Sequence, residues 1–109
     1  MDSAQVRTLI LALPDVEEYE HGGLPAFRVR GKRFATMLDT TTVNLMPGEA
    51  GIREASAAWP EHCSERWFAG RLAAARVDFE TIEHELMREL VTDAWLAKAP
   101  ASLRRQRDA

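Results

Sequence analysis

Apolar and polar residues alternate with a period of two through the centre of the chain, over residues 24–46. Such alternation is typical of strands that bury one face and expose the other to water. Gly31 lies where the chain must reverse, and residues 39–41 offer the turn chemistry for a second reversal. Pro47 ends the run. The pattern therefore predicts a three-strand antiparallel meander.

The alternation assigns two kinds of side chain to opposite faces of this meander. The apolar face collects Phe27, Val29, Phe34, Thr36, Leu38, Val43 and Leu45. The other face carries Arg28, Arg30, Arg33 and Asn44, with Lys32 at the turn. An antiparallel sheet with one solvated face gives this pattern, whereas a parallel sheet buried on both faces does not.

Helical spacing of apolar residues recurs at both ends of the chain. Residues 1–13 place one apolar stripe on a helix that Pro14 ends. Residues 78–98 carry a longer stripe, with Asp78 as the expected N-cap and Pro100 as the stop. Strands flanked by helices predict an α+β domain, in which these two helices cover the apolar face of the sheet.

The segments between these elements have weaker patterns. Residues 15–23 form an acidic connector that Gly22 and Gly23 make bendable, and Glu49–Ala58 predicts a short helix. Residues 61–65 are polar and irregular, and residues 66–73 return to strand character as at least one later strand. Residues 101–109 predict a flexible basic tail after a single domain over residues 1–100.

The composition limits the classes of function. The chain has 109 residues with 46% hydrophobic and 28% charged residues, which fits one folded domain. The net charge of −3 requires a local patch for any binding of polyanions. The single cysteine, Cys63, excludes an intrachain disulfide, and no apolar run approaches the ~18 residues of a membrane span. We expect a cytoplasmic monomer with no membrane contact.

Three stretches of the chain resemble one family in their order and spacing. These are PAFRVRGKRFA at residues 25–35, the Trp67 strand with Leu72, and AWLAKAP at residues 94–100. With the opening helix that ends in Leu13 and Pro14, they resemble the MmcQ/YjbR family. The resemblance implies a small α+β domain whose topology is compared with a double-wing DNA-binding arrangement. It also implies DNA binding by analogy of fold.

The basic hairpin is the candidate site for nucleic acid. Its four cations are Arg28, Arg30, Lys32 and Arg33. If Arg71 and Trp67 share that face, phosphate contacts would combine with one aromatic ring for stacking, which suits single strands or backbone phosphates. The candidate nucleic-acid-binding residues are therefore Arg28, Arg30, Lys32, Arg33, Trp67 and Arg71.

A plainer interpretation of the same residues favours a solvated surface. An exposed sheet face needs polar side chains, and Glu17, Glu18 and Glu20 can neutralise the cations. Trp67 can equally plug the core. The alternative function is then a protein-interaction or small-ligand-binding module without catalytic activity. A continuous positive face would favour nucleic acid, and a face broken by these acids would favour the module.

The sequence gives little sign of catalysis or of a cofactor. Cys63 with His62 or His21 as base is the one nucleophilic arrangement to weigh, but lone cysteines are more often inert. No pair of histidine and cysteine has a zinc spacing, and Gly22 and Gly23 fit no phosphate-loop fingerprint. We therefore expect neither an enzyme nor a bound metal or cofactor.

Overall fold

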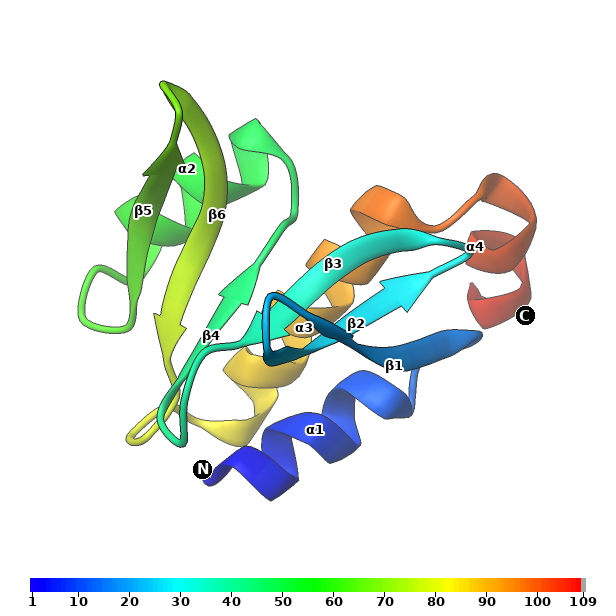
Figure 1. Cartoon of the computed structure of the whole chain (residues 1–109), viewed down its shortest axis with the longest axis horizontal. Coiled ribbons are helices and arrows are strands. Elements are labelled where there is room, and N and C mark those ends of the chain that lie inside the picture. Colours follow the sequence, from blue (N-terminus) through cyan, green and yellow to red (C-terminus); the bar gives the residue numbers. More distant parts are fainter. Residues whose placement is uncertain (109) are drawn as a thin grey trace.

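The computed structural model describes residues 1–108, without the side chain of Asp108. In chain order the elements are α1 (Ser3–Leu11), β1 (Val16–His21), β2 (Leu24–Val29), β3 (Lys32–Met37), β4 (Thr42–Leu45), α2 (Glu49–Ala58), β5 (Cys63–Phe68), β6 (Arg71–Asp78), α3 (His84–Lys98) and α4 (Ala101–Asp108). The strands form one antiparallel sheet in the order β1-β2-β3-β4-β6-β5 (Figure 1). The predicted α+β class is confirmed.

The helices leave one face of the sheet uncovered. In Figure 1 helix α3 runs behind β2 and β3, and α2 lies behind β5 and β6. The buried core accordingly joins Ile10 of α1 and Trp95 of α3 to Phe27 and Leu45 of the sheet. The prediction that the N- and C-terminal helices pack on one face is confirmed. We call the uncovered side, which faces the viewer in Figure 1, the open face.

The meander of β2, β3 and β4 is confirmed, with one irregularity that changes its faces. Phe27 pairs with Ala35, but the next residue of β2, Arg28, pairs with Arg33, so Phe34 is an extra residue in β3. This bulge shifts the alternation by one position, because each added residue exchanges the two faces.

The bulge overturns two assignments on the apolar face. Ala35 and Met37 face the helices, in the positions that strict alternation gives to Thr36 and Leu38. Thr36 lies on the open face, directly opposite Asn44. The sequence prediction was wrong for Thr36 and Leu38 because alternation alone cannot locate a bulge.

The acidic connector is a strand rather than a loop. Val16–His21 pairs with β2 through a two-residue turn in which Gly22 and Gly23 have φ of 59° and 81°. Positive φ at both positions is what a type I′ hairpin turn requires. As an edge strand, β1 can carry charged side chains along its length, which is why the acidic composition did not predict a strand.

The second half of the sheet also differs from the prediction. Residues 61–65 and 66–73 were expected as an irregular segment followed by one strand, but β5 and β6 form a hairpin instead. Ala69 and Gly70 make its turn, with φ of 50° and 78°. An Ala-Gly turn is uncommon, because L-residues avoid the left-handed region.

The C-terminal part of the chain differs from the prediction in two ways: helix α3 begins later, and a further helix follows it. Strand β6 extends to Asp78, so α3 starts only at His84, although Phe79 and Ile82 are buried as their apolar character suggested. Where a flexible tail was expected, residues 101–108 form α4 and Leu103 packs into the core. Ala109, the end of that predicted tail, lies outside the described residues.

Candidate functional site

One row of directly opposed residues crosses the open face from edge to edge. In order from β1 to β5 the row contains Tyr19, Ala26, Thr36, Asn44, Arg76 and Ser64. Directly opposed residues of antiparallel strands point to the same side of the sheet. The middle of the open face is therefore polar, with a hydroxyl, an amide and a guanidinium side by side.

Two of the predicted cations are neutralised by neighbouring carboxylates. Arg28 lies opposite Glu17 of β1 and pairs with its carboxylate, while the guanidinium carbon lies 4.2 Å from the ring centroid of Tyr19. Arg30 lies in the turn between β2 and β3 and pairs with Asp15 at 2.8 Å. Both guanidinium charges are therefore offset before any ligand arrives.

Lys32 was also misplaced by the sequence prediction. The two-residue turn consists of Arg30 and Gly31, so Lys32 already belongs to β3 and Arg30 takes the turn position. Lys32 lies opposite Val29, which faces the helices, and so it points away from the open face. Of the basic hairpin, Arg33 is left as the open-face cation that has no carboxylate partner in the part of the chain that the structure describes. It contacts Thr36 Oγ1 at 3.5 Å.

Four arginines of the open face have no carboxylate partner among the residues that the structure describes. They are Arg33, Arg66, Arg71 and Arg76. Arg66 and Arg76 share the face with Asn44, since Arg66 pairs with Ala74 two residues along β6 from Arg76. Sequence reasoning missed both, because their hairpin was expected as a single short strand.

Trp67 and Phe68 exchange the roles that the sequence suggested. Trp67 points to the helix side, where its Nε1 donates to Glu65 at 3.3 Å and Arg53 of α2 lies 5.9 Å from its ring. It is 55% exposed, so it is not a core residue, and its ring contacts Arg53 of α2 rather than the arginines of the open face. Phe68 lies opposite Arg71 and is 78% exposed, which makes it the open-face aromatic of this hairpin.

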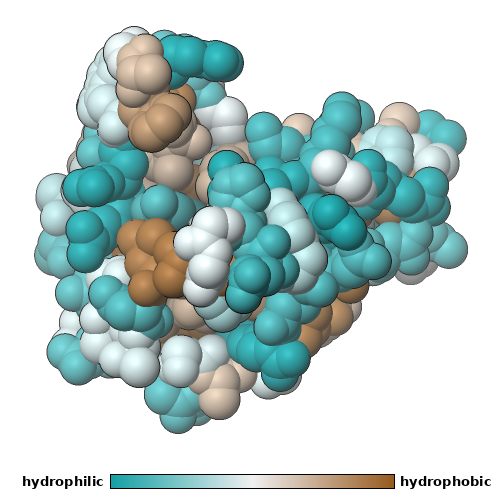
Figure 2. All heavy atoms as spheres, in the orientation of Figure 1, coloured by the Kyte–Doolittle hydropathy of each residue, from teal (hydrophilic) through white to brown (hydrophobic). Residues whose placement is uncertain are grey.

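A groove of about 470 Å³ runs along the open face between the two outer hairpins. Its walls come from the β1–β2 hairpin, the middle strands and the β5–β6 hairpin. The lining residues are His21, Gly22, Leu24, Arg33, Thr36, Leu38, Asn44, Met46, Arg66, Trp67, Phe68, Ala73 and Ala74. Figure 2 shows this face as largely hydrophilic, with one hydrophobic patch near the tip of the β5–β6 hairpin and another at mid-height in the left half of the view.

The polar atoms at the groove floor are incompletely satisfied. Thr36 is only 5% exposed, and Asn44 Oδ1 is buried without a hydrogen-bond donor among the described residues. A buried amide oxygen without a donor is costly, and such atoms are often associated with a role beyond packing. The groove thus combines unpaired cations, an aromatic ring and an unsatisfied amide.

A second cavity, of about 730 Å³, lies beside α3 and is dominated by acids. Its lining includes Glu61, Glu83, Glu85, Glu89 and Asp93. Arg88 pairs with Glu85 at 2.7 Å, so part of this charge is already offset. Among residues 1–108 no group of three or more His, Cys, Asp or Glu side chains could hold a metal ion.

Cys63 is not set up as a nucleophile. The thiol is buried at the start of β5, and burial, together with the charge of Glu61, raises the pKa of Cys63 to about 11. A thiol with so high a pKa is almost wholly protonated at neutral pH.

Within the described part of the chain, no helix combines the length and apolarity needed to cross a membrane.

Comparison with known proteins gives a match to a family. A family model described as YjbR matches residues 11–97 of the chain. The matched segment contains the six strands that the structure describes, the groove, helix α2 and all of α3 except its last residue, Lys98. No curated protein and no solved structure was found to match.

Proposed function

The chain belongs to the YjbR family, and from that premise we propose that it is a nucleic-acid-binding module that uses the open face of its sheet. One observation carries the proposal. Arg33, Arg66 and Arg76 share one face and have no carboxylate partner in the described chain. Unpaired guanidinium groups are the side chains best suited to phosphate, because their planar fork matches two phosphate oxygens.

The distribution of charge explains how an acidic protein could bind a polyanion. The net charge is −3, but acids gather around α3, on the covered side, where they line the second cavity. Of the four open-face arginines that have no carboxylate partner among the described residues, Arg33, Arg66 and Arg76 lie around Asn44. A local positive face is sufficient, because exposed charges more than about 10 Å apart are largely screened at physiological salt.

The test replaces the three arginines around Asn44 that have no carboxylate partner in the described chain and compares the loss of binding with that of a variant in which three other arginines are replaced. Arg33→Ala/Arg66→Ala/Arg76→Ala is expected to weaken oligonucleotide binding at least tenfold. It should also reduce the slope of log K against log salt by about 2 to 3, at roughly 0.7–0.9 for each lost phosphate contact. Fluorescence anisotropy at about 50 mM and about 200 mM salt measures both quantities.

The matched control removes three arginines that already have carboxylate partners, at Arg28, Arg30 and Arg88. Both variants lower the net charge by three, so a general charge effect would weaken binding equally in both. We expect the control to keep most of the affinity. An equal loss in the two variants, or no binding by the unaltered protein, would refute the proposal.

A second candidate is a small-ligand or protein-interaction module without catalytic activity. The groove of about 470 Å³ falls in the range of small-molecule sites, roughly 300–1,000 Å³. Glu17 and Asp15 also interrupt the positive face by pairing with Arg28 and Arg30, which favours this alternative, although Glu18 pairs with Arg7 instead. Either function is compatible with a cytoplasmic monomer. Binding of a small anion in the absence of any oligonucleotide binding would favour this second candidate.

A further inference from the structure

We infer that the open-face groove binds single-stranded rather than double-stranded nucleic acid, with one base stacked on Phe68. This inference rests on the proposed function and names the kind of strand. Three observations on the open face support it: the exposed ring of Phe68, the unsatisfied Asn44 amide, and the apolar tip of the β5–β6 hairpin.

Phe68 is placed as a stacking platform. Its side chain is 78% exposed, and it lies in the groove wall with Arg66 and opposite Arg71. A ring so exposed adds little to the core, whereas a base stacked on it would cover it from water. In a duplex the base faces are already stacked on each other, so only a single strand can offer one to Phe68.

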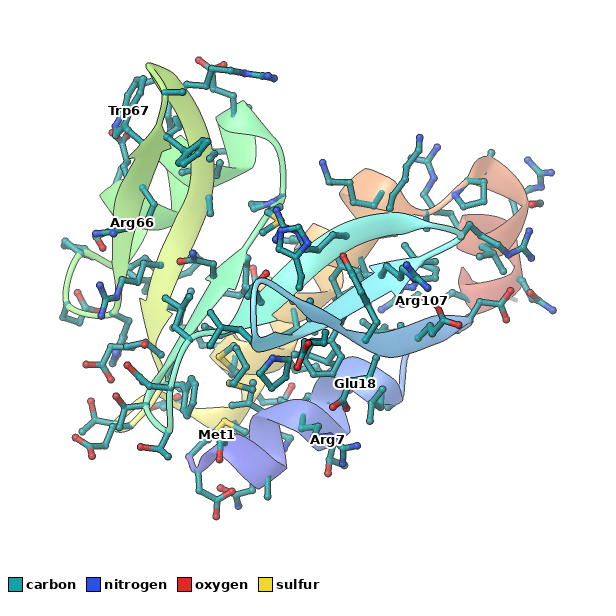
Figure 3. The ribbon with its side chains drawn as sticks, in the orientation of Figure 1. Met1, Arg7, Glu18, Arg66, Trp67 and Arg107 are labelled. Atoms are coloured by element: carbon teal, nitrogen blue, oxygen red, sulfur yellow. The ribbon has the colours of Figure 1, made fainter. Side chains whose placement is uncertain are left out.

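Trp67, the neighbour of Phe68 in β5, points to the other side of the strand. Its ring is tied to Glu65 and lies near Arg53, on the helix side of the hairpin. Figure 3 shows Trp67 near the tip of β5, with Arg66 further down the strand. The two neighbouring aromatics thus lie on opposite sides of β5. Trp67 also contributes to the groove lining, but its ring is held by Glu65 and Arg53, whereas the ring of Phe68 has no such contacts among the described residues.

The groove floor favours a base over a bare sugar-phosphate backbone. Asn44 Oδ1 is buried without a donor in the described chain, and Thr36 beside it is nearly buried. A phosphodiester offers only acceptors, whereas a base edge offers donors and acceptors together. A base edge that enters between Arg33 and Arg66 can donate to this amide oxygen once the side chains that cover it shift, whereas a phosphodiester has no donor to offer.

The usual ways of reading duplex DNA do not fit the open face. Helices enter the major groove in many duplex readers, but here the helices pack on the other face. A two-stranded ribbon can also enter the major groove, yet the tip of the β5–β6 ribbon consists of Phe68, Ala69, Gly70 and Arg71. Arg71 is the one side chain of these four residues that can hydrogen-bond to a base edge, and the other three offer only apolar surface.

The experiment compares one oligonucleotide of about ten nucleotides, a length within the range that small single-strand binders cover, in three forms. These are the single strand, the same sequence as a duplex, and the corresponding nucleoside monophosphates as competitors. We expect the single strand to bind at least tenfold more tightly than the duplex at equal salt. Phe68→Ala should weaken single-strand binding about tenfold, and Trp67→Ala should weaken it much less. Both side chains are largely exposed, so neither variant threatens the fold.

Each outcome separates the inference from the proposed function. A duplex that binds as tightly as the single strand would overturn the inference and leave the proposed function intact. So would a Phe68→Ala variant that binds normally, or a nucleoside monophosphate that competes as well as the full strand. Failure of both strand forms to bind would instead overturn the proposed function itself.

Discussion

The guanidinium of Arg28 pairs with the carboxylate of Glu17, which lies directly opposite it on the edge strand β1. The same guanidinium lies over the ring of Tyr19. An exposed pair of this kind contributes only about 0–1 kcal/mol to stability. Its larger effect is on the surface charge, because it removes one cation from the open face next to Arg33.

Releasing Arg28 should therefore strengthen binding of nucleic acid. In Glu17→Gln the guanidinium loses its ionic partner while Tyr19 keeps it on the open face. We expect the affinity for an oligonucleotide to rise about two- to fivefold at low salt, with a salt slope steeper by about 0.7. Fluorescence anisotropy measures both values.

Glu18→Gln is the matched control for this prediction. It removes the same charge from the same strand, but Glu18 faces α1 and pairs with Arg7 at 2.6 Å (Figure 3). We expect no gain in affinity beyond that of the general charge change. Equal gains in the two variants would mean that Arg28 is not the group released.

The hairpins explain which parts of the fold the sequence could predict. Regular alternation in β2 and β4 placed Phe27, Val29, Val43 and Leu45 on the buried face correctly. The bulge at Phe34 could not be read from the pattern, because a bulge depends on how the partner strand pairs. Strand β6 was missed because its alanines give almost no contrast between its two faces.

The turn of the β5–β6 hairpin stores strain that a substitution should release. Ala69 has φ of 50°, a conformation that costs an L-residue roughly 1–2 kcal/mol and that Asn tolerates best after Gly. Ala69→Asn should therefore stabilise the protein by about 0.5–1 kcal/mol, measured as the urea midpoint of unfolding. Ala69→Val should shift the midpoint in the opposite direction, and a Val variant as stable as the Asn variant would contradict the explanation.

Only part of the candidate site could be predicted from the sequence, for a related reason. Arg33 stood out because it belongs to a run of cations with clear alternation. Arg66, Phe68 and Arg76 are distant in sequence from that run and lie on the same open face only because β6 pairs with β4. The carboxylate partners of Arg28 and Arg30 likewise depend on pairing with β1 and the preceding turn, which the acidic composition hid.

Trp95 ties the C-terminal helix α3 to the segment between α1 and β1. The ring is fully buried, and its Nε1 donates to the Pro14 carbonyl oxygen at 3.0 Å. Trp95→Phe removes that donor and part of the ring, so we expect a loss of about 2–3 kcal/mol in the free energy of unfolding. Urea denaturation measures the loss.

Trp59→Phe is the control, because its indole Nε1 makes no hydrogen bond in the described structure. We expect this variant to lose less than about 1 kcal/mol, since the ring is only partly buried. Similar losses at the two positions would show that ring volume, rather than the bond to Pro14, determines the cost.

Asp93 on α3 predicts a pH dependence of stability. Partial burial, together with the charges of Glu89 and Glu54, raises the pKa of Asp93 above its ordinary value of 3.8. A carboxyl group with a raised folded-state pKa destabilises the fold when it is ionised, and the penalty disappears as the pH falls through that pKa.

Asp93→Asn should therefore be more stable than the unaltered protein at about pH 7, by roughly 0.2–0.5 kcal/mol for a like-charge pair four residues apart. Asp93→Lys should gain more, because it converts repulsion by Glu89 into attraction. Urea midpoints between about pH 7 and about pH 4 test the sign: the advantage of Asp93→Asn must shrink as the pH falls, and a constant advantage would point to a cause other than ionisation.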